Sequence, residues 1–246
     1  MSVSIPAVVI GASGYVGGEL LRLIAGHPNL DLKAAVSDSG AGKPIGELFG
    51  HLATALADHT FVPHSEWLDH VPADGDLALF SAAPHGASAG MLAEAIAACE
   101  AKGINVHVVD SSADFRFAEQ SAWEAVYKAQ HGAPDLLNQF VCALPEHVEA
   151  IDVPHVGHPG CFATASTLAT VPLIRSGLTT AEVFISGVTG STGSGKTPVA
   201  GTHHPERNSN LYAYKPLAHR HAPEVEALAE AASGRRTSVH FVPHSG

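Results

Sequence analysis

The feature that most constrains the fold is a glycine-rich turn near the N-terminus. Residues 7–10 read Ala-Val-Val-Ile, an apolar run typical of a parallel strand that is buried on both faces. Residues 11–17 follow with the spacing G-x-x-G-x-x-G, then a helical apolar pattern and a second strand over residues 30–37. This order predicts a dinucleotide site, because amide groups at a helix start bind pyrophosphate. An ordinary tight strand–helix turn is the alternative. The expected cofactor contacts are Gly11, Ser13, Gly14, Tyr15, Val16 and Gly17.

The end of the predicted second strand bears on the choice between NAD and NADP. An NAD site carries a carboxylate there for the ribose 2′-hydroxyl. Ser37 and Ser39 offer hydroxyl groups and Lys43 offers a positive charge, although Asp38 lies between the two serines. Hydroxyls and a cation suit a 2′-phosphate, so we predict NADP, held by Ser37, Ser39 and Lys43.

Strand-like and helix-like patterns continue to alternate along the first half of the chain. Strands are expected at residues 77–81, 104–109 and 140–144, and a helix at residues 88–102. Loops that follow the strands of an open parallel sheet line its ligand cleft, which predicts a cofactor contact for Pro84 and a substrate contact for Ser111. The expected fold class is α/β. A Rossmann-type doubly wound parallel sheet should occupy residues 1–155 and a second, α+β catalytic domain residues 156–246.

A single cysteine lies where the second domain is expected to begin. A Pro-Gly turn signal precedes Cys161, and apolar residues recur at helical spacing over residues 162–174. The amide groups and the dipole of a helix start favour the thiolate, which is the nucleophilic form. A buried, inert thiol is the alternative. Cys99 and Cys142 fall in an Ala-rich helix and a short strand, where we expect neutral thiols.

A second glycine loop, residues 190–197, formally matches the Walker A pattern G-x-x-x-x-G-K-[ST]. A phosphate loop of that kind opens a long helix, whereas Pro198 and Pro205 would interrupt one here. A P-loop phosphotransferase therefore stands as an alternative from a different class. We favour a polar loop at the mouth of the active site, in which Ser191 and Gly193 contact the cofactor.

Composition excludes several kinds of partner. The formal net charge of -11 argues against nucleic acid and anionic membranes, and no apolar run reaches membrane-spanning length. An odd number of cysteines, 3, fits the cytoplasm. Histidines cluster late in the chain, but they form no four-ligand set at zinc-like spacing, so no metal is expected.

These segments together resemble the N-acetyl-γ-glutamyl-phosphate reductases, within the wider family of aspartate-semialdehyde and glyceraldehyde-phosphate dehydrogenases. The resemblance covers nearly the whole chain and is highly specific in order and spacing. It rests on residues 11–17, 82–86, 110–116, 144–146, 158–161, 187–190 and 219–224.

The resemblance implies an NADPH-dependent acyl-phosphate reductase of arginine biosynthesis, acting as a homo-oligomer, either a dimer or a tetramer. Cys161 would be the nucleophile that forms a thioester, and a histidine of the His-Arg-His motif would be the acid/base. We favour His219 and keep His221 as the alternative. Amide groups at the helix start, including Gly160, would stabilise the oxyanion. Candidate clamps for the substrate carboxylate are Arg116, Arg207 and Arg220.

The chain departs from the family pattern at several positions. His158 replaces a usual Asn, and Phe162 and Cys142 each replace a usual Tyr. The closest rival substrate is the aminoadipyl phosphate, which is one methylene longer and which a pocket distinguishes by only about 1–3 kcal/mol. A non-catalytic NADP-binding sensor is a further alternative. Members of the resembled family continue past the strand expected at residues 237–242. We therefore expect a C-terminally truncated form with an open sheet edge and poor activity.

Overall fold

The computed structural model describes residues 4–246, which divide into two compact units. The first unit holds the described residues up to Phe115, with Gln130–Val141 and Asp152–His158. The second holds Arg116–Ala129, Cys142–Ile151 and Pro159–Gly246. The predicted division lies after residue 155. In the structure, Arg116–Ala129 and Cys142–Ile151, which precede that point, belong to the second unit.

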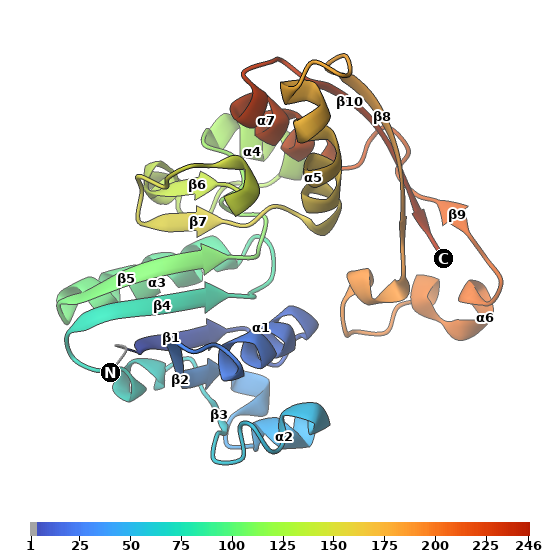
Figure 1. The fold of residues 1–246 in the computed structure, drawn as a ribbon. Helices are drawn as coiled ribbons and strands as arrows, with labels where there is room; N and C mark the ends of the chain where they lie inside the picture. Colours follow the sequence, from blue (N-terminus) through green and yellow to red (C-terminus); the bar gives the residue numbers. More distant parts are fainter. Residues whose placement is uncertain (1–3) are drawn as a thin grey trace. The chain divides into compact units, whose positions relative to one another are not determined.

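The first unit is built on a seven-stranded sheet with the order β3-β2-β1-β4-β5-β7-β6 (Figure 1). Its strands are β1 (Ile5–Ile10), β2 (Leu30–Val36), β3 (Phe61–Val62), β4 (Gly75–Ser81), β5 (Ile104–Asp110), β6 (Phe140–Cys142) and β7 (His155–Gly157). Its helices are α1 (Tyr15–Ala25), α2 (Ile45–Leu48) and α3 (Ser88–Ala101). Strand β1 pairs in parallel with both β2 and β4, and β4 pairs in parallel with β5.

Alternate residues of β1 enter two different apolar cores. One core combines one face of β1 with the buried side of α3 and includes Val8, Ile10, Leu92 and Ile96. The other combines the opposite face of β1 with α1 and includes Ala7, Val9, Leu21 and Ile24. A strand that is buried on both faces explains the continuous apolar run in the sequence. Each fully buried Leu or Ile side chain contributes about 1.5–3 kcal/mol.

The order of the strands in the sheet reverses between β1 and β4. It runs from β1 to β2 and β3 on one side, and then returns to β4 and β5 on the other side. Ligands of open α/β sheets bind beyond the strand ends at such a switch point. The glycine turn after β1 lies there, which places the predicted nucleotide loop where the topology favours a ligand.

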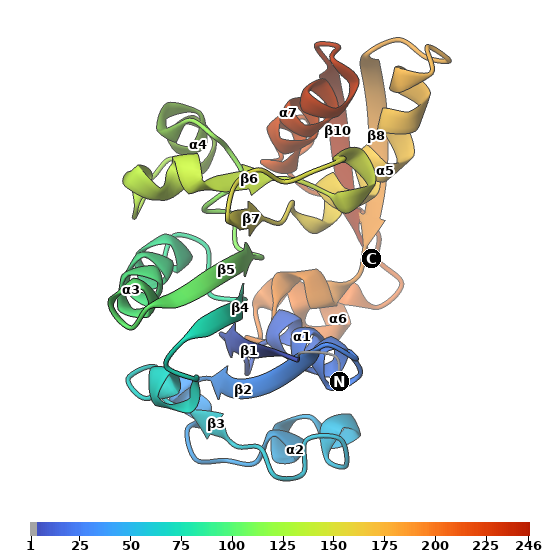
Figure 2. The same cartoon turned by 60° about the vertical axis from the view of Figure 1, so that its left-hand side comes forward.

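The second unit packs helices on one face of a three-stranded sheet. Its strands are β8 (Glu182–Thr189), β9 (Tyr212–Ala213) and β10 (Ser238–Ser245), and its helices are α4 (Gln120–Tyr127), α5 (Cys161–Arg175), α6 (His204–Arg207) and α7 (His221–Ser233). Strand β10 lies in the middle, parallel to β8 and antiparallel to β9. Helices α5 and α7 lie beside β8 and β10 (Figure 2), and their apolar residues share one core with Val183 and Phe241.

The opposite face of the β8–β10 sheet carries exposed apolar side chains. Phe184 is 78% exposed and Val188 is 67% exposed, and both lie on β8. The Phe184 ring stacks on the imidazole of His240, with ring centroids 4.4 Å apart. Exposed large apolar side chains on one face of a sheet suit contact with another protein surface.

Candidate active site

Cys161 is the first residue of α5, one residue earlier than the helix predicted at residues 162–174. Its side chain is exposed, and Gly160 is the N-cap residue before it. The first amide groups of a helix lack intrahelical acceptors and carry the positive end of its dipole, so they stabilise an anion beside them. The thiol therefore lies at a helix start, beside backbone N–H groups that have no acceptor within the helix.

Two buried imidazoles from the His-Arg-His segment lie in the same unit as this thiol. His219 is 9% exposed and His221 is 7% exposed, and their ring centroids are 4.6 Å apart. The ring of Phe162, the residue after Cys161, is 6.2 Å from His219 and 6.4 Å from His221. Gly187 of β8 leaves room for that ring, since a Cβ there would come within 2.5 Å of it. The two histidines and the start of α5 thus belong to one packed cluster.

Both imidazoles are neutral near pH 7. Burial lowers the pKa of His221 to about 4, even though Glu224 acts in the opposite direction. Burial also lowers the pKa of His219, with help from the positive charges of Arg220 and Lys215. His219 Nδ1 accepts the amide N–H of His221 at 3.1 Å, so its proton resides on Nε2. His221 Nδ1 is buried and has no hydrogen-bond partner among residues 4–246.

The ring of His221 occupies the space beside the Cα atom of Gly160. A Cβ built on Gly160 would meet Nε2, Cε1 and Cδ2 of that ring at less than van der Waals separation. The backbone of Gly160 has φ -62° and ψ 156°, which any residue adopts. Glycine is needed here for close approach and not for its conformational freedom.

A tyrosine that carries no sequence signal, Tyr214, packs against His219. The Tyr214 ring lies 5.6 Å from the His219 ring, edge to face. Burial raises the pKa of Tyr214, and the charge of the Cys161 thiolate raises it further. The Tyr214 hydroxyl thus stays protonated near neutral pH. An isolated Tyr in an irregular segment carries no periodic signal that could have revealed it.

The three predicted arginine clamps have different surroundings. Arg116 is buried and donates two hydrogen bonds from Nη1 to Glu224, at 3.1 and 3.3 Å. Arg207 donates to the hydroxyls of Ser245 at 2.5 Å and Tyr212 at 3.3 Å. Arg220 is exposed, and its guanidinium lies 5.5 Å from the centre of the Tyr127 ring. Among the three, Arg220 has the geometry most open to a ligand.

In the first unit, the glycine turn is shaped by two close approaches. Gly11 has φ +73°, and a Cβ on it would lie 2.6 Å from the carbonyl oxygen of Ala82. A Cβ on Gly17 would lie 2.5 Å from the carbonyl oxygen of Gly11. Gly14 is the N-cap of α1 and presents the amide groups of the first helical turn. Side chains at Gly11 and Gly17 would collide with the backbone of this turn, so only glycine keeps its shape.

Hydroxyl groups gather beyond the end of β2. Ser37 Oγ donates to Ser13 Oγ at 2.8 Å and lies 3.4 Å from Ser39 Oγ. The carboxylate of Asp38 accepts the backbone N–H of His64 at 2.8 Å. Asp38 thus joins the loop after β2 to the segment after β3, while the three serines form a continuous polar edge. Lys43 is exposed in the loop that follows.

The loops after β4 and β5 are joined by buried polar groups. Ser88 Oγ donates to Asp110 at 2.8 Å and lies 2.7 Å from Ser81 Oγ, and the backbone N–H of Ser111 donates to the carbonyl oxygen of Ser81 at 2.8 Å. The Asp114 carboxylate accepts backbone N–H groups on either side of the α3 start, at 2.7 and 2.9 Å. These contacts fix the loops that carry Pro84 and Ser111 within the first unit.

Residues 190–197 do not open a helix. After β8 they form one short 3-10 turn, Ser191–Ser194, followed by another 3-10 turn at Ala200–Thr202. A Walker A loop needs a long helix to present its amide groups to phosphate, so the phosphotransferase reading does not fit the geometry. Ser191 and Gly193 lie in this exposed loop.

The other two cysteines have the environments expected of unreactive thiols. Burial raises the pKa of Cys99 to about 11 and that of Cys142 to about 12.

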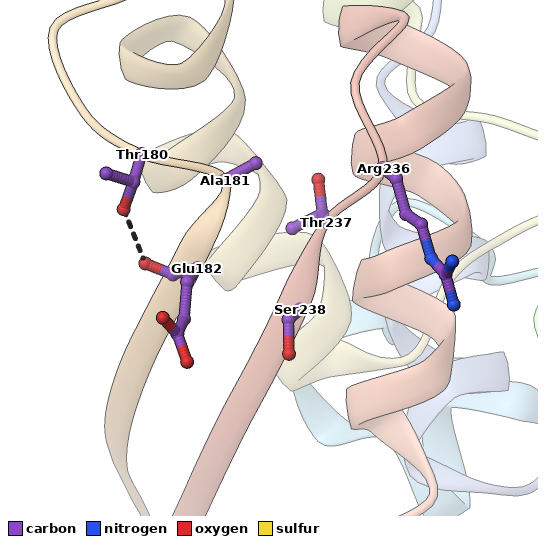
Figure 3. A pocket seen from close by; sticks show the side chains of 6 residues that line it. All are labelled: Thr180, Ala181, Glu182, Arg236, Thr237 and Ser238. Atoms are coloured by element: carbon purple, nitrogen blue, oxygen red, sulfur yellow. Dashed lines mark hydrogen bonds between the residues drawn. The ribbon is translucent and has the colours of Figure 1, made fainter.

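A hollow of about 520 Å³ is lined by Thr180, Glu182 and Arg236 (Figure 3). It lies at the entry to β8 and β10, beyond the C-terminal end of α5, so the helix length of about 20 Å separates it from Cys161.

Two family models match this chain in succession. The semialdehyde dehydrogenase NAD binding domain matches residues 6–153, and the semialdehyde dehydrogenase dimerisation domain matches residues 161–246. The chain belongs to the semialdehyde dehydrogenase family of oxidoreductases. The predicted fold class is confirmed by this match and by a solved neighbour. That neighbour is aspartate semialdehyde dehydrogenase with NADP from Candida albicans, with a TM-score of 0.61, 14% identity and coverage of 98% of this chain and 67% of the neighbour.

The predicted resemblance within that family is also confirmed. An N-acetyl-gamma-glutamyl-phosphate reductase from Methanosarcina barkeri is 39% identical over 98% of this chain and 67% of its own length. One from Nitrosococcus oceani is 37% identical over 98% of this chain and 68% of its own. A [LysW]-L-2-aminoadipate/[LysW]-L-glutamate phosphate reductase from Saccharolobus solfataricus is 36% identical over 100% of this chain and 68% of its own. The chain spans about two thirds of the length of these relatives.

Within residues 4–246, every helix is too short or too polar to cross a bilayer.

Proposed function

We propose that this chain reduces N-acetyl-γ-glutamyl phosphate to the corresponding semialdehyde, with NADPH as the reductant and Cys161 as the nucleophile, as a step of arginine biosynthesis. The observation that carries the proposal is the thiol at the start of α5, in one cluster with two neutral imidazoles. The names of the relatives at 37% and 39% identity support the choice of acyl phosphate.

The first step is acyl transfer to sulfur. The Cys161 thiolate attacks the acyl carbon, a C–S bond forms, and the C–O bond to phosphate breaks so that inorganic phosphate leaves. The amide groups at the start of α5 stabilise the oxyanion of this step. Cys161 thereby holds the substrate as a thioester, which is a better hydride acceptor than a carboxylate.

The imidazole of His219 acts in the second half of the reaction. When bound, NADPH supplies the hydride that reduces the thioester carbonyl. His219 Nε2–H donates a hydrogen bond to the carbonyl oxygen as negative charge develops on it. The tetrahedral species then collapses to the aldehyde and returns the electron pair of the C–S bond to Cys161. His221 remains the alternative donor.

NADP is favoured over NAD by the polar edge at the end of β2. Ser37 and Ser39 offer hydroxyls, Lys43 adds a positive charge, and the Asp38 carboxylate is already engaged by the N–H of His64. The pyrophosphate belongs at the amide groups of residues 11–17, beside Ser13. We also retain Pro84 as a cofactor contact, because its loop follows β4 of the parallel sheet, and we keep Ser191 and Gly193 as cofactor contacts in the loop after β8.

For the substrate we retain the arginines and the polar groups of the loops. The sequence predicts contacts from Ser111, Arg116, Gly160, Arg207 and Arg220, but Glu224 accepts hydrogen bonds from both the guanidinium of Arg116 and the backbone N–H of Gly160. Because Arg116 is paired with Glu224, Arg220 is the better partner for a carboxylate that enters from solvent. The rival substrate is the aminoadipyl phosphate named for the relative from Saccharolobus solfataricus.

The protein acts as a homodimer in this proposal, with the tetramer as the larger alternative. The match to a dimerisation domain and the apolar outer face of β8, with Phe184 and Val188 exposed, support an assembly of like subunits. A nucleophilic thiol must stay reduced, which favours the cytoplasm as the site of action. Substituting Phe184 by Lys should lower the molar mass seen by light scattering if this face joins subunits.

The reverse reaction tests the proposed function. The chain should form NADPH from NADP and N-acetyl-glutamate semialdehyde only when inorganic phosphate is present, because phosphate must release the thioester. The aminoadipate semialdehyde, assayed in parallel, ranks the two substrates by kcat/KM. Phosphate-independent turnover would point to thioester hydrolysis by water and would contradict the acyl-phosphate assignment.

A further inference from the structure

One buried carboxylate, on Glu224, accepts hydrogen bonds from three residues of the second unit. Arg116 Nη1 donates to it at 3.1 Å, the Tyr127 hydroxyl at 2.6 Å and the backbone N–H of Gly160 at 3.0 Å. The side chain of Glu224 is 0% exposed. A carboxylate at such a depth is costly unless it is paired and hydrogen-bonded, and all three donors satisfy it.

The carboxylate stays ionised despite its burial. Burial by itself raises the pKa of Glu224, but the Arg116 charge, the proximity of His221 and the bonds from Tyr127 and Gly160 together hold that pKa below its usual range. An ionised carboxylate only accepts hydrogen bonds, so its three donors have fixed directions. The same negative charge holds the Tyr127 hydroxyl in its protonated form, with a raised pKa.

The position of Glu224 joins two helix starts. Glu224 lies in the first turn of α7, whose first residue is His221. Gly160, which donates to it, immediately precedes Cys161 at the start of α5. The Glu224 carboxylate therefore ties the backbone at Gly160, next to Cys161, to the start of α7, where His221 lies. The contact of the His221 ring with the Cα atom of Gly160 fixes the same junction from the other side.

We propose that Glu224 is a positioning residue. Through Gly160 it sets the distance between the Cys161 thiol and the histidines, and Arg116 and Tyr127 hold Glu224 in place. The inference rests on the proposed function only for its kinetic readout, because the reactivity of the thiol can be measured without turnover. It also assigns Arg116 to Glu224 and leaves carboxylate binding to other groups.

The test compares two carboxylate-to-amide changes on the same helix. Glu224→Gln keeps the shape and one acceptor oxygen, but it removes the charge that orders Arg116 and Tyr127. Glu226→Gln is the matched control, because Glu226 also lies on α7 and accepts a backbone N–H, that of Val239 at 2.9 Å. Both variants are measured as full chains for alkylation of Cys161 by iodoacetamide across a pH series, for kcat and KM, and for melting temperature.

Glu224→Gln should change the pH profile of Cys161 alkylation and lower kcat by about 10- to 100-fold with little change in KM, because small misplacements of reacting groups cost about that much. Glu226→Gln should lower the melting temperature without changing the alkylation profile. The proposal is overturned if Glu224→Gln leaves the alkylation profile and kcat like those of the control, or if it raises KM alone, which would mark a substrate contact. Altered alkylation in a chain that lacks reductase activity would instead refute the proposed function and leave the positioning role intact.

Discussion

At the residue scale, the most sensitive position is Gly160, where the absence of a side chain makes room for the ring of His221. Gly160→Ala keeps an allowed backbone conformation, so any effect comes from the methyl group. We expect the ring to be displaced, with a loss of about 1–3 kcal/mol in unfolding free energy and reduced turnover. Urea denaturation and an activity assay would measure both.

A glycine in open space provides the control for that substitution. Gly90 lies in α3, and a Cβ on it would meet nothing within 4 Å. Gly90→Ala should therefore stabilise the protein by about 0.4–1 kcal/mol. Equal changes in unfolding free energy for the two substitutions would mean that the contact between Gly160 and His221 does not contribute to stability.

The three thiols should differ in reactivity, which is also a residue-scale property. Cys99 and Cys142 have raised pKa values of about 11 and 12, both because of burial, and are largely protonated at neutral pH. Cys161 is exposed at a helix start. Brief alkylation near pH 7, followed by peptide mass spectrometry, should find the label first on Cys161. Prior labelling of Cys142 would contradict this account of the site.

At the element scale, the strand–turn–helix patterns predicted most of what positions the ligands. The segments β1, α1, β2, β4, α3 and β5 lie within a few residues of their predicted ranges, because each carries either a doubly buried apolar run or a long helical period. The sequence predicts no helix at α7, because its start lies within the His-Arg-His segment, where a proline at position 223 interrupts the helical pattern. Periodicity also gives no sign that Glu224 is buried, because its partners Arg116 and Tyr127 are about a hundred residues away along the chain.

The loop after β2 carries the prediction on cofactor choice. Lys43→Ala removes the positive charge next to the serine edge, so it should raise the Kd for NADPH by about 10- to 150-fold and leave that for NADH nearly unchanged, given about 1.5–3 kcal/mol for a charge-assisted contact. Fluorescence titration with the two cofactors measures this directly. An equal loss of affinity for both would remove Lys43 from 2′-phosphate recognition.

At the scale of the whole molecule, buried histidines should make the fold sensitive to acid. The pKa of His155 is lowered to about 4, like that of His221, in each case mainly by burial. A lowered pKa means that the unfolded chain binds more protons than the folded one below about pH 6.5. The stability that each neutral imidazole preserves is therefore complete above pH 6.5. The free energy of unfolding falls as the pH drops toward 4, by up to about 3 kcal/mol per group.

Other groups modify this trend without reversing it. The lowered pKa values of His147 and His219 act in the same direction, whereas Asp110, whose pKa is raised by burial, opposes it. Urea midpoints measured at pH 7.5, 5.5 and 4.5 should fall steadily. A midpoint that stays constant over this range would show that these imidazoles are not buried in solution.

The covalent step through Cys161 is the central claim, and the Cys161→Ala variant tests it most directly. The measurement is phosphate-dependent formation of NADPH from the semialdehyde and NADP, with NADP affinity measured on the same sample. The glycine turn at residues 11–17 is untouched by this change, so NADP should bind as tightly as before. We predict that turnover falls by at least about three orders of magnitude, because removal of a nucleophile leaves only binding effects. Substantial phosphate-dependent turnover by Cys161→Ala would contradict the thioester mechanism.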